Sequence, residues 1–254
     1  MVAIEIDDVR DPRLADYRGL RERGKESDEY FIVEGLTAIE RLLRSQYPVR
    51  SVLLTPATHA RIADRLDGTI TTYVLSEEQM SSVAGVNLHR GAVASASRLP
   101  PPSLGEVLPA AKRIVMLEGI NDHENLGAIA RTARGLGADA LLLDSTCADP
   151  FYRRSVRVSM GELLHLPIVR CANWSEAFDE VAAAGFEIWA LTPSPEATDI
   201  LTLTAPQRWA LVVGAEGPGL SSDTLARCLN VRIPMRNGVD SLNVGHAVAA
   251  ALAR

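Results

Sequence analysis

The hydrophobic positions in the first part of the chain form short runs, rich in β-branched side chains, that predict strands. These runs are Tyr30–Val33, Val49–Thr55, Thr71–Leu75 and Gly91–Ser97. Two stretches between them carry apolar residues at the spacing of one helix face, Leu36–Leu43 and Ala57–Leu66. The alternation of strands and helices predicts a small α/β sandwich.

In the rest of the chain the apolar runs are nearly continuous, as expected of parallel strands that are covered on both faces. The runs are Arg113–Leu117, Ala140–Leu143, Ile168–Arg170, Phe186–Leu191, Trp209–Val213 and Val231–Ile233. Helical spacing predicts helices between and after them, at Leu126–Leu136, Ser175–Ala184, Ser221–Leu229 and Leu242–Ala253. This pattern predicts a second α/β domain built on a parallel sheet.

Three consecutive prolines, Pro100, Pro101 and Pro102, separate the two patterns. Proline ends helices and lacks the backbone donor that a sheet needs. The sequence therefore predicts a first domain over residues 1–98, a proline-rich linker over residues 99–107 and a second domain over residues 108–254.

The chain has 254 residues, of which 47% are hydrophobic and 23% charged, a balance typical of a soluble globular protein. It contains no apolar run long enough to cross a membrane, and its first residues are acidic where a signal peptide would be basic. We therefore expect a cytoplasmic protein with no membrane partner. Cys147, Cys171 and Cys228 lie far apart in the sequence, so we expect buried free thiols and no metal site.

The net charge of −6 opposes binding to nucleic acid, because Lys and Arg supply most of the affinity for phosphate. The acidic excess is divided equally between residues 1–107 and residues 108–254, so an RNA surface would have to be a local patch. Two segments offer such a patch, and each is equally well explained as a solvated helix face. Their candidate RNA contacts are Arg18, Arg21, Arg23 and Lys25 in the first, and Arg153, Arg154 and Arg157 in the second.

The first segment with candidate chemistry, Leu117–Arg134, is predicted to be a strand, a polar turn and a helix. Asn125 suits the N-cap of this helix, because its side-chain oxygen can accept a bond from a free amide of the first turn. Arg131 follows among small apolar residues, where a buried guanidinium needs an anionic or carbonyl partner. That partner is either a ligand phosphate or a carboxylate such as Glu118 or Glu216.

The second segment, Leu211–Ser221, runs from a strand into a loop in which Gly214, Gly217 and Gly219 surround Glu216. Glycine lets the backbone bend sharply and approach a bound molecule closely. The loop lacks the Gly-Lys-Ser or Gly-Lys-Thr of a Walker A loop, and its glycine spacing differs from the dinucleotide fingerprint. It is either a cradle for another ligand or a tight turn without one.

The third segment, Val231–His246, is predicted to be a strand that ends at Pro234, a polar loop, and the start of the final helix. Asp240 or Ser241 could cap this helix. Ser241 and Asn243 would then lie at its N-terminus, where free amides and the helix dipole favour polar ligand groups.

In order and spacing, these segments resemble the motifs of the SpoU (TrmH-like) RNA 2′-O-ribose methyltransferases of the SPOUT class. The stretches that carry the resemblance are Asn125–Arg131, Gly214–Gly219, Ile233–Met235 and Ser241–Val244. The first domain is similar, over Phe31–Gly35 and His89–Val93, to the substrate-binding domain of two-domain members, which has a fold like that of kink-turn-binding ribosomal proteins.

The resemblance implies S-adenosylmethionine as cofactor and methylation of a ribose 2′-hydroxyl in a structured ribosomal or transfer RNA. It also implies that the last strand and helix form a deep trefoil knot, which no periodicity would predict because knots are nearly absent among folds. A homodimer with its sites near the subunit interface is implied as well.

By resemblance, the catalytic residues are Asn125, Arg131, Glu216, Ser241 and Asn243. The residues implied to bind the cofactor are Leu191, Gly214, Glu216, Gly217, Gly219, Ile233, Met235, Ser241, Leu242 and Asn243, and Arg90 and Arg131 join the candidates for RNA contact. A guanidinium with a pKa above about 12 is a poor base, so we expect Arg131 to hold an RNA phosphate and stabilise the developing alkoxide. Asn125 would orient Arg131, and Glu216 would hold Arg131 or the loop in place.

His123 and His246 flank the motifs and could act as a general base, but a packing role on the final helix is the more common outcome for a residue placed like His246. Three other functions fit part of the pattern: a binding protein of the same fold without catalysis, an enzyme that uses a nucleotide such as NAD, and a relative that methylates a base. The presence of every motif residue argues against the first, and the absence of Gly-x-Gly-x-x-Gly argues against the second.

Overall fold

The computed structural model describes residues 3–20, 27–86, 88 and 91–253. The chain divides into two compact units: residues up to Leu99 group with Phe151–Leu164, and Pro100–Pro150 group with the residues from His165 onward. The sequence placed residues 151–164 in the second domain, whereas their contacts assign them to the first unit.

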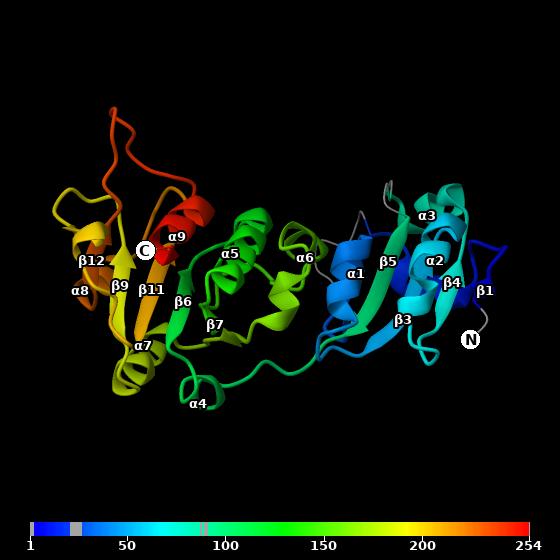
Figure 1. The fold of residues 1–254 in the computed structure, drawn as a ribbon, viewed down its shortest axis with the longest axis horizontal. Helices are drawn as coiled ribbons and strands as arrows, with labels where there is room; N and C mark the ends of the chain where they lie inside the picture. The colour runs from blue at the N-terminus through cyan, green and yellow to red at the C-terminus, as the bar shows by residue number, and fades with distance from the viewer. Residues whose placement is uncertain (1–2, 21–26, 87, 89–90, 254) are drawn as a thin grey trace. The chain divides into compact units, whose positions relative to one another are not determined.

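The first unit is built on a mixed five-stranded sheet with the order β1-β4-β3-β5-β2 (Figure 1). Its strands are β1 (Ile4–Glu5), β2 (Tyr30–Glu34), β3 (Val49–Leu54), β4 (Thr72–Val74) and β5 (Ala92–Ser97). β5 pairs antiparallel with β2 and β3, while β4 pairs parallel with β3 and β1. The four predicted strands are therefore present, and β1 is too short to give a periodic pattern.

Helices cover both faces of this sheet because alternate strand residues are apolar on each face. The helices are α1 (Leu36–Leu42), α2 (Pro56–Ile62), α3 (Glu77–Ala84) and α6 (Arg153–Val158), with 3-10 helices at Pro12–Tyr17, Ala63–Arg65 and Glu162–His165. On one face, Ile32 and Leu53 pack with Met80 of α3. Helix α3 was not predicted, although a capping box between Ser76 and Gln79 marks its start.

The second unit contains a seven-stranded sheet with the order β10-β12-β9-β11-β6-β7-β8, and every neighbouring pair is parallel. Its strands are β6 (Arg113–Glu118), β7 (Ala140–Leu143), β8 (Ile168–Arg170), β9 (Glu187–Leu191), β10 (Thr198–Asp199), β11 (Trp209–Gly214) and β12 (Leu229–Arg232). The predicted α/β fold with a parallel sheet is thus confirmed.

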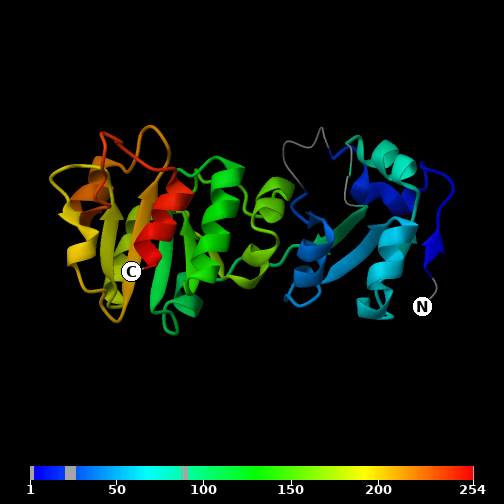
Figure 2. The same cartoon turned by 45° about the horizontal axis from the view of Figure 1, so that its top comes forward.

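The helices of the second unit are α4 (Leu104–Val107), α5 (His123–Gly135), α7 (Trp174–Ala183), α8 (Ser222–Ala226) and α9 (Val244–Leu252), with a 3-10 helix at Ile200–Thr202. On one face of the sheet, Phe178 of α7 packs with Met116 and Val212 in the core. Helices α5 and α9 lie side by side over the strands (Figures 1 and 2). The sheet is therefore covered on both faces, as its continuous apolar runs required.

Several boundaries differ from the sequence prediction, two of them in the type of element that is formed. Helix α8 ends at Ala226, and the chain is already in β12 at Leu229, where the helix was expected to end. The predicted linker contains α4, and Leu104 of this helix lies in the core of the second unit. Within the described residues, none of the helices is both long and apolar enough to cross a membrane.

Candidate functional site

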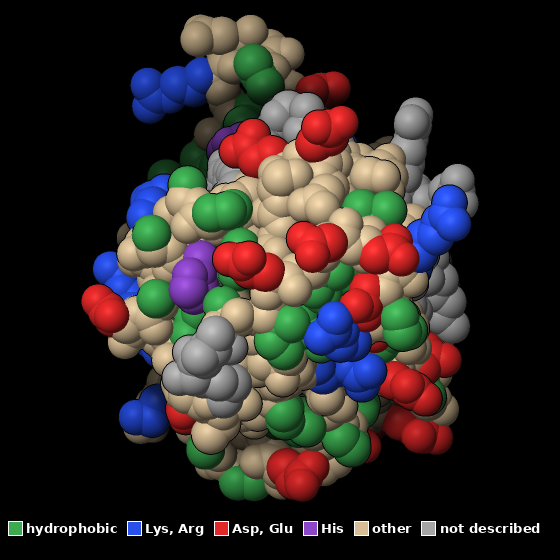
Figure 3. Space-filling view, turned by 90° about the vertical axis from the view of Figure 1, so that its right-hand side faces the viewer, with side chains coloured by type: hydrophobic (Ala, Val, Ile, Leu, Met, Phe, Trp, Pro, Cys, Tyr) green, Lys and Arg blue, Asp and Glu red, His purple; other side chains and the backbone are tan. Residues whose placement is uncertain are grey.

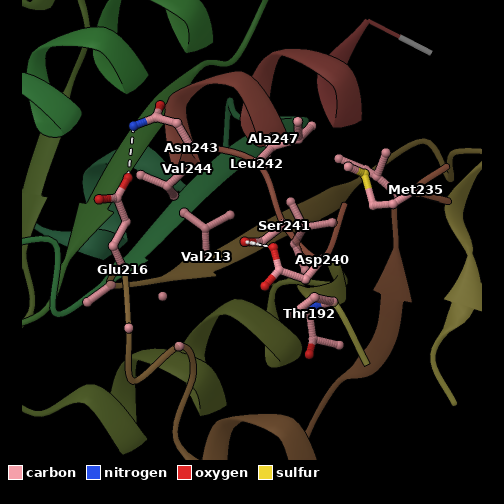
Figure 4. A pocket seen from close by; sticks show the side chains of 17 residues that line it. Thr192, Val213, Glu216, Met235, Asp240, Ser241, Leu242, Asn243, Val244 and Ala247 are labelled. Carbon is pink, nitrogen blue, oxygen red and sulfur yellow. Dashed lines mark hydrogen bonds between the residues drawn. The ribbon is translucent and has the colours of Figure 1, made fainter. Parts of the chain in front are cut away.

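A cavity of about 700 Å³ lies beyond the carboxyl ends of β9, β11 and β12, beside the N-terminus of α9. Open parallel sheets commonly bind their ligands at this edge. All ten residues that the resemblance gives as cofactor-binding line the cavity: Leu191, Gly214, Glu216, Gly217, Gly219, Ile233, Met235, Ser241, Leu242 and Asn243. The sequence did not predict a cofactor-binding role for the other residues that line it, Thr192, Pro193, Val213, Ala215, Asp240, Val244 and Ala247 (Figure 4).

The glycine loop closes tightly on itself at one wall of the cavity. The Gly219 amide donates to the Ala215 carbonyl at 3.0 Å, and these two residues form an isolated antiparallel bridge. A Cβ added at Gly214 would lie 2.3 Å from the carbonyl carbon of Gly219, a distance that no side chain tolerates. Gly217 and Gly219 have φ values of +91° and +71°, which favour glycine. The loop therefore depends on glycine for space at its start and for conformation beyond it.

Glu118, at the end of β6, anchors the far end of this loop. Its carboxylate accepts bonds from the Ser221 amide at 2.7 Å and the Trp174 indole at 3.0 Å, and a further bond from the Thr224 hydroxyl. Glu118 also pairs in register with Gly214 on β11. The sequence considered Glu118 only as a partner for Arg131, and its observed role is to hold both ends of the glycine loop.

The three candidate segments meet through the side chain of Asn243. Its Nδ2 donates to Glu216 Oε1 (Figure 4) and to Asn125 Oδ1, each at 2.8 Å, and its Oδ1 accepts from the Gly245 amide at 3.0 Å. Asn243 is thus the N-cap of α9, in place of the predicted Asp240 or Ser241. One amide joins motifs that are more than a hundred positions apart in the sequence.

The N-cap of α5 is Asp122, and the prediction of Asn125 as the cap is wrong. The Asp122 carboxylate accepts bonds from the amides of Glu124 and Asn125 at 2.9 and 2.8 Å. Because the cap lies three residues earlier than predicted, Asn125 is within the first turn, and its side chain is available to bond with Asn243.

Arg131 lies on α5, exposed and outside the wall of the cavity. Its predicted burial among small residues is wrong, because those residues face α9: a Cβ on Gly245 would lie 3.3 Å from the Cβ of Ala128. Among the described residues, Arg131 forms no hydrogen bond or ion pair, so neither Glu118 nor Glu216 is its partner, and Asn125 does not orient it directly. The Arg131 guanidinium is free to meet a ligand.

The two histidines that flank the motifs do not line the cavity. His246 is exposed on α9, so the prediction of a packing histidine is wrong. His123 is the first residue of α5 and is partly buried.

The candidate RNA contacts outside the motifs have different surroundings. Arg153 forms an ion pair with Glu34 at 2.7 Å, and Arg157 approaches the same carboxylate at 3.8 Å, while Arg154 is exposed. Arg18 donates to the Asp11 carbonyl at 2.8 Å. Arg21, Arg23, Lys25 and Arg90 lie outside the described residues. On the face in Figure 3, acidic side chains are widely scattered, with basic ones between them in small groups, so this view shows no continuous basic surface.

The cysteines are not arranged as ligands or nucleophiles. Cys147 and Cys171 are buried and Cys228 is partly buried, as free thiols. Burial raises the pKa of Cys147 to about 12 and those of Cys171 and Cys228 to about 11. In the part of the chain that the structure describes, no group of three or more His, Cys, Asp or Glu side chains could hold a metal ion.

Comparison with known proteins identifies the family. The model of the SpoU rRNA methylase family matches residues 112–253, which contain the whole cavity. The chain belongs to this SpoU family. An uncharacterized tRNA/rRNA methyltransferase of Mycobacterium tuberculosis is 41% identical to it, over 98% of this chain and 89% of the relative. The 23S rRNA (guanosine(2553)-2′-O)-methyltransferase RlmP of Bacillus subtilis is 30% identical, over 98% and 96% of the two chains.

Solved structures of SpoU proteins share the fold. An AdoMet-bound rRNA methyltransferase from Sinorhizobium meliloti superposes with a TM-score of 0.81 at 25% identity, covering 98% of this chain and 96% of that one. The SpoU methyltransferase AviRb from Streptomyces viridochromogenes, in complex with AdoMet, superposes with a TM-score of 0.77 at 26% identity, covering 96% of each chain. This SpoU protein is therefore an RNA methyltransferase with S-adenosylmethionine as its cofactor.

The cavity itself fits this cofactor. Its volume lies within the range of ligand pockets, and its walls combine apolar side chains such as Val213 and Leu242 with backbone from the glycine loop. It also contains the carboxylates of Glu216 and Asp240, which suit a positively charged ligand.

Proposed function

We propose that this SpoU protein methylates a ribose 2′-hydroxyl of a structured RNA, ribosomal or transfer. The observation that carries the proposal is the junction at Asn243, which brings Asn125 and Glu216 to one cavity with the family's cofactor chemistry. Its relative in Bacillus subtilis is named as a ribose 2′-O-methyltransferase of ribosomal RNA, which supports the ribose as acceptor.

The ends of the strands would hold the cofactor. Backbone groups near Leu191, Gly214, Ile233, Met235 and Leu242 lie around the cavity, where their amides and carbonyls can bond to a purine and a ribose. When bound, S-adenosylmethionine supplies an activated methyl group. The task of the protein is then to align donor and acceptor, because in-line displacement gains most from positioning.

Arg131 would act on the RNA. It is exposed and without a partner in the described chain, so it can bind a phosphate beside the target nucleotide and stabilise the alkoxide as the hydroxyl loses its proton. Asn243 and Glu216 would keep the wall of the cavity in place, and Ser241 would contact the target ribose from the N-terminal side of α9.

The larger assembly follows the family resemblance. We propose a homodimer whose second subunit lies near the cavity, a trefoil knot formed by the chain around β12 and α9, and an RNA-binding role for the first unit, which resembles kink-turn-binding ribosomal proteins. The α/β architecture of both units is compatible with these proposals. We also propose that the protein acts in the cytoplasm, because ribosomal and transfer RNA are present there.

Arg131→Ala should reduce methyl transfer to RNA by at least about a hundredfold, because mutation of a group that stabilises transition-state charge has effects of that order. Calorimetric affinity for S-adenosylmethionine should stay within about twofold of the wild type, since Arg131 does not line the cavity. Arg131→Lys keeps the charge without the planar fork and should recover part of the activity. Arg134→Ala, an exposed change on the same helix, is the control for general loss of charge. Retained turnover in Arg131→Ala would refute the assignment.

A further inference from the structure

The cavity is acidic. Among the residues that line it, all of them within the described chain, Glu216 and Asp240 are carboxylates and none is Lys, Arg or His. None of the ion pairs formed by the described residues includes either carboxylate. A ligand that enters this cavity therefore meets negative charge, and the described residues that line the cavity include no cation to balance it.

The two carboxylates are held differently. Glu216 accepts a bond from the Asn243 amide and so belongs to the junction of the three motifs. Asp240 is exposed at the cavity, and among the described residues its side chain accepts a bond only from the adjacent Ser241 hydroxyl, at 3.2 Å (Figure 4). Asp240 lies just before the stretch Ser241–Val244 that carries the resemblance, and the resemblance gave it no role in the site.

The charge of the ligand changes during the reaction. As the acceptor oxygen forms its bond to the methyl carbon, the electron pair of the broken S–C bond stays on sulfur. The sulfonium of S-adenosylmethionine is thereby converted to the neutral thioether of S-adenosylhomocysteine, and the proton of the hydroxyl leaves to solvent. The donor therefore carries one positive charge and one methyl group more than the product, while the rest of the two molecules is the same.

We propose that Asp240 is a specificity-determining residue whose carboxylate makes the cavity bind the positively charged sulfonium donor more tightly than the neutral thioether product. A carboxylate near a cation stabilises it by Coulomb attraction, whereas its interaction with the neutral thioether is small. Because Asp240 is exposed, solvent and salt screen the attraction, and we expect a preference of about three- to tenfold. This preference would help S-adenosylmethionine to displace the product after each turnover.

The test compares ligands of different charge by isothermal titration calorimetry on the full-length protein. Asp240→Asn removes the charge and keeps the shape. Its affinity for S-adenosylmethionine should fall about three- to tenfold, and so should that for sinefungin, which has a charged amine in place of the sulfonium; affinity for S-adenosylhomocysteine should change less than about twofold. Added salt should weaken the donor preference of the wild type and leave that of Asp240→Asn nearly unchanged.

Two further variants serve as controls. Asp240→Glu keeps the charge and should retain the preference for the donor. Asp223→Asn removes the same charge from an exposed position on α8 outside the cavity, and should leave all three affinities unchanged. Equal weakening of all three ligands in Asp240→Asn would overturn the proposal and assign Asp240 to a neutral part of the ligand, such as a ribose hydroxyl. Unchanged affinities would also overturn it.

The inference rests on the cofactor and not on the atom of the RNA that receives the methyl group. Methylation at a base nitrogen would refute the proposed function without changing the affinities for the three ligands. Conversely, suppose that Asp240→Asn changes the affinities for the charged and the neutral ligands equally and the protein still methylates ribose. That result would refute only the role of Asp240.

Discussion

At the scale of single residues, Asn243 has two separable tasks. Its Oδ1 caps α9 through the Gly245 amide, and its Nδ2 joins Asn125 to Glu216. Asn243→Ala removes both and should reduce the free energy of unfolding by about 1 kcal/mol, as N-cap losses do. Asn243→Ser keeps a capping oxygen, so its stability should stay near that of the wild type. Affinity for S-adenosylmethionine, measured by calorimetry, should fall about tenfold in both variants, because Glu216 loses its partner.

The informative result is an Asn243→Ser variant with the stability of the wild type and a lower affinity for S-adenosylmethionine. If that variant binds S-adenosylmethionine like the wild type, the bond to Glu216 does not shape the cavity. The melting temperature of each variant, measured without ligand, reports the capping contribution by itself.

The sequence predicted much of the site residue by residue, but not all of it. The motif glycines and Asn243 are recognisable because their type and spacing follow from what a ligand loop and a helix start require. Asp240 and Glu118 were missed as site residues because their roles depend on contacts formed only after folding. Arg131 was placed in the wrong surroundings because small neighbours indicated burial, whereas they serve the close packing of α5 on α9.

At the scale of elements, the glycine loop after β11 forms one wall of the cavity, so the shape of the cavity depends on the conformation of this loop. Gly214→Ala places a Cβ against the backbone of Gly219 and Leu220, which cannot rotate away as a side chain would. The loop must shift, so stability should fall by about 1–3 kcal/mol and affinity for S-adenosylmethionine by at least about tenfold. Both quantities are measurable by thermal unfolding and calorimetry.

Gly135→Ala is the matched control for that change. Gly135 is the last residue of α5, and an added Cβ there would meet no atom within 4 Å. Alanine favours the helix, so this variant should gain up to about 1 kcal/mol and bind the cofactor normally. Normal cofactor binding by Gly214→Ala would mean that the loop adapts more easily than its geometry indicates.

Strands of the buried parallel sheet were predicted more reliably than short helices. Six of the seven parallel strands of the second unit follow from nearly continuous apolar runs, which burial on both faces demands, whereas β10 has only two polar residues and was not predicted. Helices α6 and α8 have only six and five residues, too few to show a helical period, and so one was missed and the other was extended into β12. The caps of α5 and α9 were also misplaced, because several polar residues at each start could serve and only the folded backbone selects one.

At the scale of the whole molecule, the proposed tasks are divided between the two units: the second would carry out methyl transfer, and the first would bind RNA. The cavity lies entirely in the second unit, which the family model matches, and the first unit is a mixed α/β sheet to which the segment 151–164 is added. The prolines indicated the boundary near residue 100. The grouping of residues 151–164 with the first unit was not predictable, because it arises from contacts such as the ion pair of Arg153 with Glu34.

The net charge of −6 opposes the binding of RNA, because RNA is itself negatively charged. Arg153 and Arg157 already share a carboxylate within the structure, which reduces the positive charge they can offer to phosphate. We therefore expect the protein to recognise the shape of its RNA through a small number of contacts and not through a broad basic surface. Recognition by shape is common for structured RNA. Arg131, exposed and unpaired among the described residues, is the basic group that this account requires at the target.

The position of the transferred methyl group decides whether the protein is a ribose methyltransferase. Unmodified ribosomal and transfer RNA would be incubated with the protein and isotopically labelled S-adenosylmethionine, digested to nucleosides and analysed by fragmentation mass spectrometry. We predict that the label stays with the ribose fragment and that the base fragment has its ordinary mass. A label on the base fragment, or no incorporation by protein that binds the cofactor, would contradict the proposed function.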